Sequence, residues 1–312
     1  MPDFSIITPV LNQALTIQAC IDSVATQNVN VEHIIIDGGS TDGTVDIIRQ
    51  NADKLTYWVS ETDNGQSHAI NKGLGKATGT FFNWLNADDR LADNALKTVQ
   101  QHINPQTEVV VGKCQHVTAL NEVLAEGSAR IWNTTEATLG NYSMGQPSVF
   151  YRTEIVRNLG GLNEHLHLCL DMDLWFRYLC KNGIEKVDAT EETLSHFLVH
   201  DDAKSSRQAE EMKTEKYGIY KALFAGVELD DVLKDFFNQY STPAGISYSI
   251  HHLSFDEILS HFAWHLLVDA YAEKDYPKAA SLLKIVDHGS RFTTKEKMEW
   301  KSRLASAKIL NR

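Results

Sequence analysis

The sequence predicts an α/β fold, in which a mixed sheet is flanked by helices, with an α-helical C-terminal appendage. Two observations support this prediction. Over about the first 90 residues, short apolar segments alternate with segments whose apolar residues recur every three or four positions, which indicates strands alternating with helices. Beyond about residue 208, helical patterns continue without strands. We therefore expect an α/β domain over residues 1–207 and a helical extension over residues 208–312.

The strands of the predicted domain are short, apolar and bounded by turn-forming residues, as in buried parallel strands. Pro9 is expected to end the first of them. Alternation with helices implies right-handed crossovers. The predicted strands are residues 4–8, 31–36, 55–60, 80–85, 109–112 and 148–151, and the predicted helices are residues 15–25, 45–51, 67–76 and about 171–182.

The predicted extension consists of helical stretches at residues 210–237 and 254–310, separated by a loop around Pro243. Residues 262–271 and 276–286 resemble a helical hairpin. Because no second copy of this hairpin follows at a fixed period, a solenoid is excluded. We expect the extension to pack on the main domain or on a partner, including a second copy of the chain in a homo-oligomer.

Composition and charge exclude several classes of protein. The formal net charge of −12 argues against nucleic acid as a partner, because such binding depends on Lys and Arg that neutralise phosphates. No signal peptide precedes the first strand, and no apolar run approaches the roughly 20 residues of a transmembrane segment. The four cysteines form no CxxC pair, which favours reduced thiols. We expect a cytoplasmic protein, and peripheral association with the inner face of the membrane is compatible with these observations.

Polar side chains follow the predicted strands of the N-terminal part. Ligands bind beyond the carboxyl ends of the strands in such sheets, so these positions are candidates for a binding site. No G-x-G-x-x-G follows the first strand and no Gly-Lys-[Ser/Thr] has P-loop spacing, which disfavours a dehydrogenase and a P-loop kinase. The polar residues at the strand ends are Thr8, Asn12, Asp37, Glu61, Asp63, Asn86, Asp88 and Asp89.

Two of these strand ends have both a structural and a functional interpretation. The oxygen ligands around Asp88 suit Mg²⁺ or Mn²⁺ together with substrate phosphates, whereas in the alternative Asp88 or Asp89 caps the helix that begins near residue 93. In the loop after Asp37, Ser40 or Asp42 can cap the next helix, and this would leave the Asp37 carboxylate free for a ribose hydroxyl or a base NH.

These segments together resemble the family 2 glycosyltransferases with the GT-A fold, a Rossmann-like nucleotide-diphospho-sugar transferase fold. Each motif alone is weak, but they occur in the right order from about residue 3 to residue 207. The matching segments are residues 5–12, 36–43, 60–66, 69–73, 77–79, 84–89, 146–152, 160–164 and 171–175.

The resemblance implies a nucleotide-sugar donor and a role for each matching residue. Asp171 would be the general base that deprotonates the acceptor hydroxyl, with inversion at the anomeric carbon. Asn86, Ala87 and Asp88 would form this chain's version of the DxD motif, in which Asp88 binds a divalent metal, Mn²⁺ or Mg²⁺. The remaining donor-binding residues would be Thr8, Pro9, Asn12, Asp37 and Asp63 around the nucleoside, and Lys72, His200 and Lys204 at the diphosphate.

The sequence departs from the family pattern at two functional positions. Asn86 replaces the first Asp of the DxD motif, which leaves Asp88 as the main metal carboxylate. Leu170 stands where many relatives have Glu, which leaves the base to be chosen between Asp171 and Asp173. A UDP-sugar donor and a glycan or lipid-linked acceptor in surface polysaccharide synthesis are expected from the frequency of these substrates in the family.

Three rival interpretations follow from the same residues. The chain could be an inactive module that binds a nucleotide sugar. It could be a nucleotidyltransferase, although residues 8–12 are neither glycine-rich nor basic. The helical C-terminus could also be its main functional part, as a scaffold.

Overall fold

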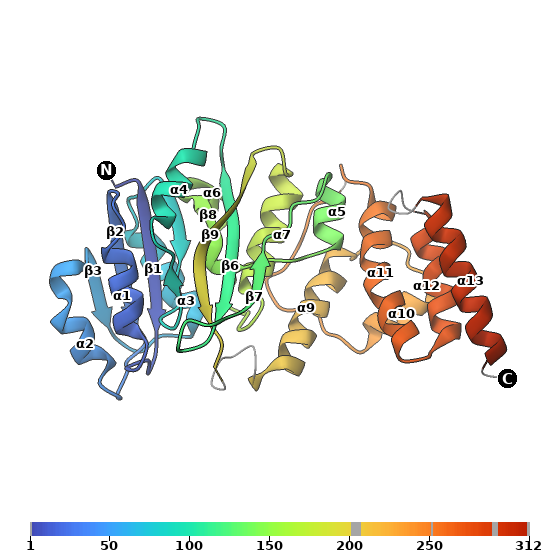
Figure 1. Cartoon of the computed structure of the whole chain (residues 1–312), viewed down its shortest axis with the longest axis horizontal. Helices are drawn as coiled ribbons and strands as arrows, with labels where there is room; N and C mark the ends of the chain where they lie inside the picture. Colours follow the sequence, from blue (N-terminus) through green and yellow to red (C-terminus); the bar gives the residue numbers. More distant parts are fainter. Residues whose placement is uncertain (1, 201–206, 251, 289–292, 311–312) are drawn as a thin grey trace.

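A computed structural model describes residues 2–200, 207–250, 252–288 and 293–310 (Figure 1). Its strands form one mixed sheet whose order, within the described residues, is β3-β2-β1-β4-β8-β6-β9-β5, with β7 paired to β6. Helices lie on both faces of this sheet, and the chain ends in a group of helices at the far side of the molecule from β3. The predicted fold class is confirmed.

The first half of the sheet is parallel, and its strands alternate with helices as predicted. The boundaries differ from the predicted ones by one or two residues. The strands are β1 (Phe4–Val10), β2 (Val31–Asp37), β3 (Tyr57–Ser60) and β4 (Phe81–Trp84), and the helical segments between them are α1 (Ile17–Ala25), α2 (Thr44–Gln50), the short 3-10 helix η1 (Ala52–Lys54) and α3 (Gln66–Lys76).

Pro9 lies inside β1, so the prediction that it ends the strand is wrong. Backbone groups alternate between the two neighbours of a strand, and Ile7 accepts a hydrogen bond from Leu85 on the β4 side. The nitrogen of Pro9 therefore also faces the β4 side. Because the pairing of β1 with β4 ends at Ile7 and Trp84, no ladder hydrogen bond is lost there.

The second half of the sheet mixes directions. β8 is antiparallel to β4 and β6, β9 is parallel to β6, and β5 is antiparallel to β9. β6 is five residues longer than the predicted strand at residues 109–112, because its outer half also pairs with β7. The elements are β5 (Arg90–Leu91), α4 (Ala95–His102), β6 (Val109–Val117), β7 (Val123–Ser128), α5 (Thr135–Gly140), η2 (Gln146–Ser148), β8 (Val149–Arg152), α6 (Thr153–Asn158), α7 (Leu170–Asn182) and β9 (Val187–Leu198).

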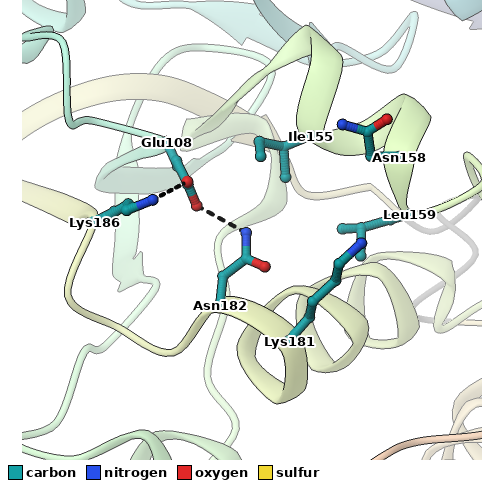
Figure 2. A pocket seen from close by; sticks show the side chains of 7 residues that line it. All are labelled: Glu108, Ile155, Asn158, Leu159, Lys181, Asn182 and Lys186. Atoms are coloured by element: carbon teal, nitrogen blue, oxygen red, sulfur yellow. Dashed lines mark hydrogen bonds and ion pairs between the residues drawn. The ribbon is translucent and has the colours of Figure 1, made fainter.

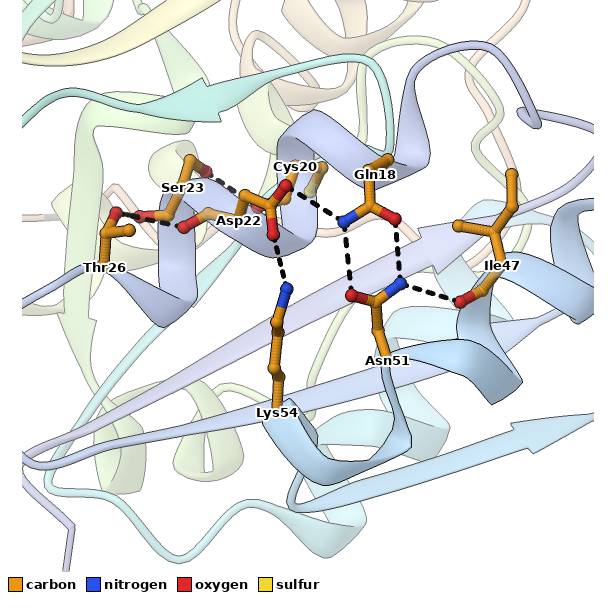
Figure 3. A network of polar contacts seen from close by, with 8 residues as sticks. All are labelled: Gln18, Cys20, Asp22, Ser23, Thr26, Ile47, Asn51 and Lys54. Carbon is orange, nitrogen blue, oxygen red and sulfur yellow. Dashed lines mark hydrogen bonds and ion pairs between the residues drawn. The ribbon is translucent and has the colours of Figure 1, made fainter.

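Two hydrophobic clusters lie on opposite faces of the sheet. One contains Phe4 and Ile6 of β1 with apolar residues of α1, α2 and α4, and the other contains Ile7 of β1 with residues of α3 and α7. Between α1 and α2, Gln18 of α1 and Asn51 after α2 exchange two amide hydrogen bonds of 3.2 and 2.8 Å (Figure 3). These contacts fix the helices that flank the first two strand ends.

The C-terminal helices continue the same core. The α11–α12 pair is the predicted hairpin, and it turns through Lys274, whose φ is 63°. Phe262 and Leu282 belong to the same buried cluster as Trp175 of α7. The core is therefore continuous across residue 208, and the two-part division of the chain stays a prediction. The helices are α9 (Ala209–Leu223), α10 (Asp231–Asn238), α11 (Phe255–Ala272), α12 (Tyr276–His288) and α13 (Thr294–Leu310).

None of the helices in the described part of the chain has both the length and the apolar character that a membrane span requires. The four cysteines are buried and unpaired, as predicted.

Candidate functional site

The carboxyl ends of the parallel strands meet at one edge of the sheet. In the register of the ladders, Val10 of β1 lies beside Asp37 of β2, and Asp37 lies beside Ser60 of β3. β4 ends next to β1, where Trp84 pairs with Ile7. The four loops that follow these strands are thus neighbours, and they carry most of the predicted donor-binding residues.

Hydrogen bonds connect the loop after β1 to the loop after β2. The Asn12 backbone N–H donates to Ser40 Oγ at 2.7 Å, and the Thr41 N–H donates to Asn12 Oδ1 at 2.9 Å. Asp42 Oδ2 accepts from the Ala14 N–H at 3.0 Å. Asn12 has a φ of 53°, a left-handed conformation that Asn tolerates better than most residues. Asn12 is exposed at this edge, where it was predicted to meet the nucleotide.

Asp37 is fully buried, and its carboxylate is not free, so that part of the prediction is wrong. Oδ2 accepts hydrogen bonds from the N–H groups of Gly39 and Ser40, each at 3.0 Å, and from the Ser60 hydroxyl at 2.6 Å. Oδ1 accepts from the Ser40 hydroxyl at 2.5 Å. Asp37 therefore holds the loop after β2 in shape, while Asp42 accepts from the Thr44 N–H at the start of α2.

Thr8 and Pro9 are also buried, beneath the strand end. The Thr8 hydroxyl lies 2.9 Å from His33 Nε2, and burial lowers the pKa of His33 to about 3. His33 is therefore neutral at physiological pH. Thr8, Pro9 and His33 therefore belong to the buried layer beneath the site.

Asp63 lies against the loop after β2. A Cβ atom added to Gly38 would come within 2.9 Å of Asp63 Oδ2, so the side chain at position 38 must be absent for Asp63 to lie there. Asp63 Oδ1 accepts from the Gly65 N–H at 2.8 Å. Nearby, the predicted phosphate contact Lys72 forms an ion pair with Glu61. The predicted contact Lys204 lies outside the described residues.

The Asn86–Asp89 segment does not cap the next helix, which begins at Ala95 after Asn94. Asn86 instead accepts a hydrogen bond from Gln66 at 2.7 Å and donates to Asp89 at 3.2 Å. Asp89 is fully buried, and burial together with the neighbouring charge of Asp88 raises the pKa of its carboxyl group well above the ordinary value. Ala87, the middle residue of the motif, is buried.

Asp88 and His200 are brought together from positions 112 residues apart, with 3.1 Å between Asp88 Oδ2 and His200 Nε2. Both side chains are partly exposed. No group of three or more potential metal ligands occurs among the residues that the structure describes. One accessible carboxylate, completed by substrate phosphates, nevertheless fits the way Mg²⁺ and Mn²⁺ are commonly held in nucleotide sites.

The two candidate bases on α7 have different surroundings. Asp173 is 1 % exposed, forms an ion pair with Arg177 at 2.7 Å, and accepts a hydrogen bond from Tyr248 at 2.9 Å. Asp171 is only half-buried and accepts a hydrogen bond from the Tyr142 hydroxyl at 3.0 Å. Burial raises the pKa of Asp171. Of the two residues, Asp171 is the more exposed.

The N-terminus of α3 connects the donor loops to this carboxylate. On one side Gln66 donates to Asn86, and on the other the Ser67 hydroxyl donates to the Leu166 carbonyl at 3.2 Å. Leu166 belongs to the loop that leads into α7, and a Cβ atom added to Gly65 would lie 4.0 Å from His167 Nδ1. The Asn86–Asp88 segment and the loop that leads to Asp171 therefore both contact one helix end.

A pocket at the opposite edge of the sheet lies away from these residues. Glu108 precedes β6 and accepts from Lys186 and Asn182 at 2.7 and 2.8 Å (Figure 2). β6 runs antiparallel to β8, which runs antiparallel to β4, so the start of β6 lies at the edge where β4 starts. None of the predicted site residues lines this pocket.

Three contact residues of the site were missed by sequence reasoning. Tyr142 donates to Asp171, Gln66 orients Asn86, and Glu215 accepts from three backbone N–H groups in the loop before α7. Gln66 lies in the matching segment 60–66, but no local pattern indicates that it contacts Asn86. No signal in the sequence indicates Tyr142 or Glu215, because their partners are distant in the chain.

Comparison with known proteins places the chain in a family. Residues 5–153 match the family model described as Glycosyl transferase family 2. A PGL/p-HBAD biosynthesis glycosyltransferase of Mycobacterium bovis is 31% identical over 186 residues, which cover 56% of this chain and 69% of the relative. A GalNAc(5)-diNAcBac-PP-undecaprenol beta-1,3-glucosyltransferase of Campylobacter jejuni is 30% identical over 119 residues, 36% of this chain and 38% of that relative.

Solved structures share the fold. S. aureus TarS 1–349 in complex with UDP-GlcNAc superposes with a TM-score of 0.60 at 17% identity, covering 92% of this chain and 81% of that one. The chain spans only 54% of the longer TarS chain that it matches. The mannosyltransferase PcManGT of Pyrobaculum calidifontis, in complex with GDP-Man and Mn2+, has a TM-score of 0.54 at 19% identity, covering 99% and 87%. With these matches, the chain belongs to the family 2 glycosyltransferases and has the GT-A fold.

Proposed function

We propose that this glycosyltransferase inverts the configuration of the sugar that it transfers from a nucleotide diphosphate donor, a UDP-sugar, to an acceptor hydroxyl. The observation that carries the proposal is the position of Asp171. It is the more exposed of the two aspartates at the start of α7, and the loop that leads to it contacts the N-terminus of α3, which also contacts Asn86.

Asp171 is the proposed general base. Its raised pKa makes the carboxylate a better proton acceptor than an exposed aspartate. The acceptor hydroxyl gives its proton to Asp171, and its oxygen bonds to the anomeric carbon. The bond from that carbon to the diphosphate oxygen breaks on the opposite face, and the nucleoside diphosphate leaves with the electron pair.

The donor is proposed to lie over the loops that follow β1 to β4. Asn12 and Asp63 are the accessible polar groups for the nucleoside, and Thr8, Pro9 and Asp37 shape the loops beneath it. Lys72 and His200 are proposed contacts of the diphosphate, with Lys204 retained from the sequence prediction.

Asp88 is proposed to hold a divalent cation, with Asn86 and Ala87 forming the rest of the motif. When bound, Mn²⁺ or Mg²⁺ would neutralise the charge that develops on the departing diphosphate. This chain carries a net charge of −12, so it has few other means of doing so. Support comes from the Mn2+ in the related fold of the GDP-Man complex.

The choice of substrates rests on the relatives. TarS binds UDP-GlcNAc, whereas PcManGT binds GDP-Man, so the UDP assignment follows the structure with the higher TM-score. The name of the C. jejuni relative contains an undecaprenyl-diphosphate-linked glycan, which supports a lipid-linked acceptor in polysaccharide synthesis. Such an acceptor favours a cytoplasmic enzyme at the inner face of the membrane.

The domain division is kept as a proposal, with residues 1–207 as the catalytic part and residues 208–312 as a helical extension that also mediates homo-oligomerisation. The alternative, an inactive module that binds nucleotide sugars, is disfavoured because the accessible Asp171 would then have no use.

A thermal-shift panel of nucleoside diphosphates and nucleotide sugars, with and without Mn²⁺, tests the donor assignment. The expected result is stabilisation by UDP and a UDP-sugar that increases with Mn²⁺. Stabilisation by GDP instead would move the proposal to a GDP-sugar. If no nucleotide stabilised the protein under either condition, the proposed function would be wrong.

A further inference from the structure

A carboxylate from the helical extension lies directly on the loop that leads to Asp171. Glu215 of α9 accepts hydrogen bonds from three consecutive backbone N–H groups. Oε1 accepts from His167 at 2.9 Å, and Oε2 accepts from Leu168 and Cys169, each at 2.9 Å. Cys169 is the residue before α7, and Asp171 is the second residue of that helix.

The Leu168 and Cys169 N–H groups are partly buried, whereas the His167 N–H lies at an exposed position. The loop turns into α7 at Cys169, whose φ and ψ of −110° and 35° are not helical, and its N–H groups precede the helix. A buried N–H without a partner is costly, and a carboxylate that accepts several N–H bonds is a strong partner. The same carboxylate lies at the positive end of the α7 dipole.

Helix α9 also supports the other side of Asp171. The Tyr220 hydroxyl donates to the Leu139 carbonyl at 3.0 Å, in the segment that leads to Tyr142. Tyr142 in turn donates to Asp171. One helix of the extension therefore holds both the loop before Asp171 and the chain segment that carries its hydrogen-bond donor.

We propose that Glu215 is a positioning residue for the catalytic base: its carboxylate fixes the peptide groups that determine where α7 begins and so where Asp171 lies. This inference rests on the proposed role of Asp171. It assigns part of the catalytic centre to the helical extension, beyond the residues that the family model matches.

The charge of Glu215 also affects the pKa of Asp171. The ionisable groups that face Asp171 are Tyr142, Tyr151, Cys169 and Glu215. Burial raises the pKa values of Tyr142, Tyr151 and Cys169, so these groups stay protonated near neutral pH. Burial, with a smaller contribution from the Glu215 charge, raises the pKa of Asp171. Removing that charge should lower the pKa of Asp171.

The test compares Glu215→Gln with Glu211→Gln in the full chain. Glu211 lies one turn earlier on α9 and is exposed, so it is the matched control. Gln offers one acceptor oxygen where the carboxylate offers two. We expect Glu215→Gln to lower kcat about tenfold or more, because small misplacements of a catalytic group are costly. The KM for the donor should stay within about twofold, because the donor loops are not touched. The acid limb of the pH–rate profile should move to lower pH.

Hydrogen exchange separates positioning from overall stability. The N–H groups of residues 167–169 should exchange faster in Glu215→Gln than in Glu211→Gln, with exchange in β1 unchanged. The proposal is overturned if the two variants have the same kcat, or if these N–H groups exchange equally. It is also overturned if the loss appears in the donor KM instead of kcat.

If the wild-type protein transferred no sugar from any nucleotide donor, the proposed function would fail on its own. The positioning of Asp171 would still be decided by hydrogen exchange and by an NMR titration of the Asp171 carboxyl group. An unchanged titration in Glu215→Gln would overturn the inference.

Discussion

The donor side and the base side of the site are built in different ways. On the donor side, the loops after β1 and β2 hold each other through contacts such as that between Asn12 and Ser40, which are 28 residues apart. On the base side, Asp171 depends on Tyr142 and on a loop held by Glu215, so the supports lie both before and after it in the chain. The contacts between the loops after β1 and β2 lie within the first 90 residues, whereas Asp88 also pairs with His200.

This difference predicts which measured quantity a mutation on each side should change. The donor loops follow four adjacent strand ends, and the loops after β1 and β2 also bond to each other, so changes there should affect donor affinity. Among the described residues, the proposed base Asp171 accepts one side-chain hydrogen bond, from Tyr142, and depends on one supporting loop, so changes there should affect the rate of transfer more than donor affinity. The following variants test whether changes on the two sides affect the rate of transfer and the donor affinity separately.

Asp171→Asn should have the largest effect. Loss of the general base is expected to lower kcat by roughly 10²–10⁴-fold, since proton transfer contributes that much to catalysis. The dissociation constant for the nucleotide should not change. Steady-state kinetics and calorimetric titration with the nucleoside diphosphate measure the two quantities.

Asp173→Asn is the matched variant on the same helix. Because Asp173 is buried and paired with Arg177, its loss should lower the free energy of unfolding by roughly 3 kcal/mol. If Asp171→Asn kept its activity while a folded Asp173→Asn lost it, the base would have to be reassigned to Asp173.

Asp88→Asn should have the next largest effect, and it should act on the donor side. Removal of a group that stabilises charge on the leaving diphosphate is expected to cost about 10²-fold in kcat/KM. A chelator should reproduce the loss in the wild-type protein and add little in the variant. Asp93→Asn, at an exposed position a few residues on, is the control. Equal sensitivity of both variants to the chelator would contradict the metal assignment.

Gly38→Ala should weaken donor binding without affecting the base. The added Cβ would lie 2.9 Å from Asp63 Oδ2, and that carboxylate is tethered to Gly65. Displacing it should cost about 1 kcal/mol, or about fivefold in the donor KM. Gly75→Ala on α3 has open space at the Cβ position and should match the wild type. A fall in kcat at constant KM would show that the two sides are coupled.

Tyr142→Phe should have the smallest effect, confined to low pH. The Tyr142 hydrogen bond stabilises the ionised carboxylate, so its loss raises the pKa of Asp171 further. Because the base acts in its ionised form, the acid limb of the kcat/KM profile should move to higher pH, opposite to the shift expected for Glu215→Gln. Activity above this limb should change little. A shift to lower pH would contradict the assigned hydrogen bond.

The sequence was sufficient for the fold class and most of the elements on the donor side. Apolar patterns identify β1, β2 and β4 because these strands are buried, and they identify α1 because it has one buried apolar face. Pro9 was misjudged because its neighbour strand ends two residues earlier, a fact of register that no local pattern contains.

The side-chain contacts of the site were less predictable. The Asp37 carboxylate looked free because one of its four donors, Ser60, comes from the next strand, 23 residues on. Asp88 and His200 were predicted separately, from resemblance, and only the fold brings their atoms together across 112 residues. Glu215 is one of several acidic residues on α9, and nothing local distinguishes it from Glu211.

The placement of Glu215 has a consequence for synthesis of the chain on the ribosome. The N–H groups of residues 167–169 are made about 46 to 48 residues before the carboxylate that they bond to. The loops after β1 and β2, by contrast, have their partners within the first 90 residues. Since chains fold from the N-terminus as they emerge, the loops after β1 and β2 can form before residues 167–169 find their partner. The hydrogen bonds to Glu215 can form only when α9 has left the exit tunnel, so we expect the proposed base to be positioned after these loops are in place.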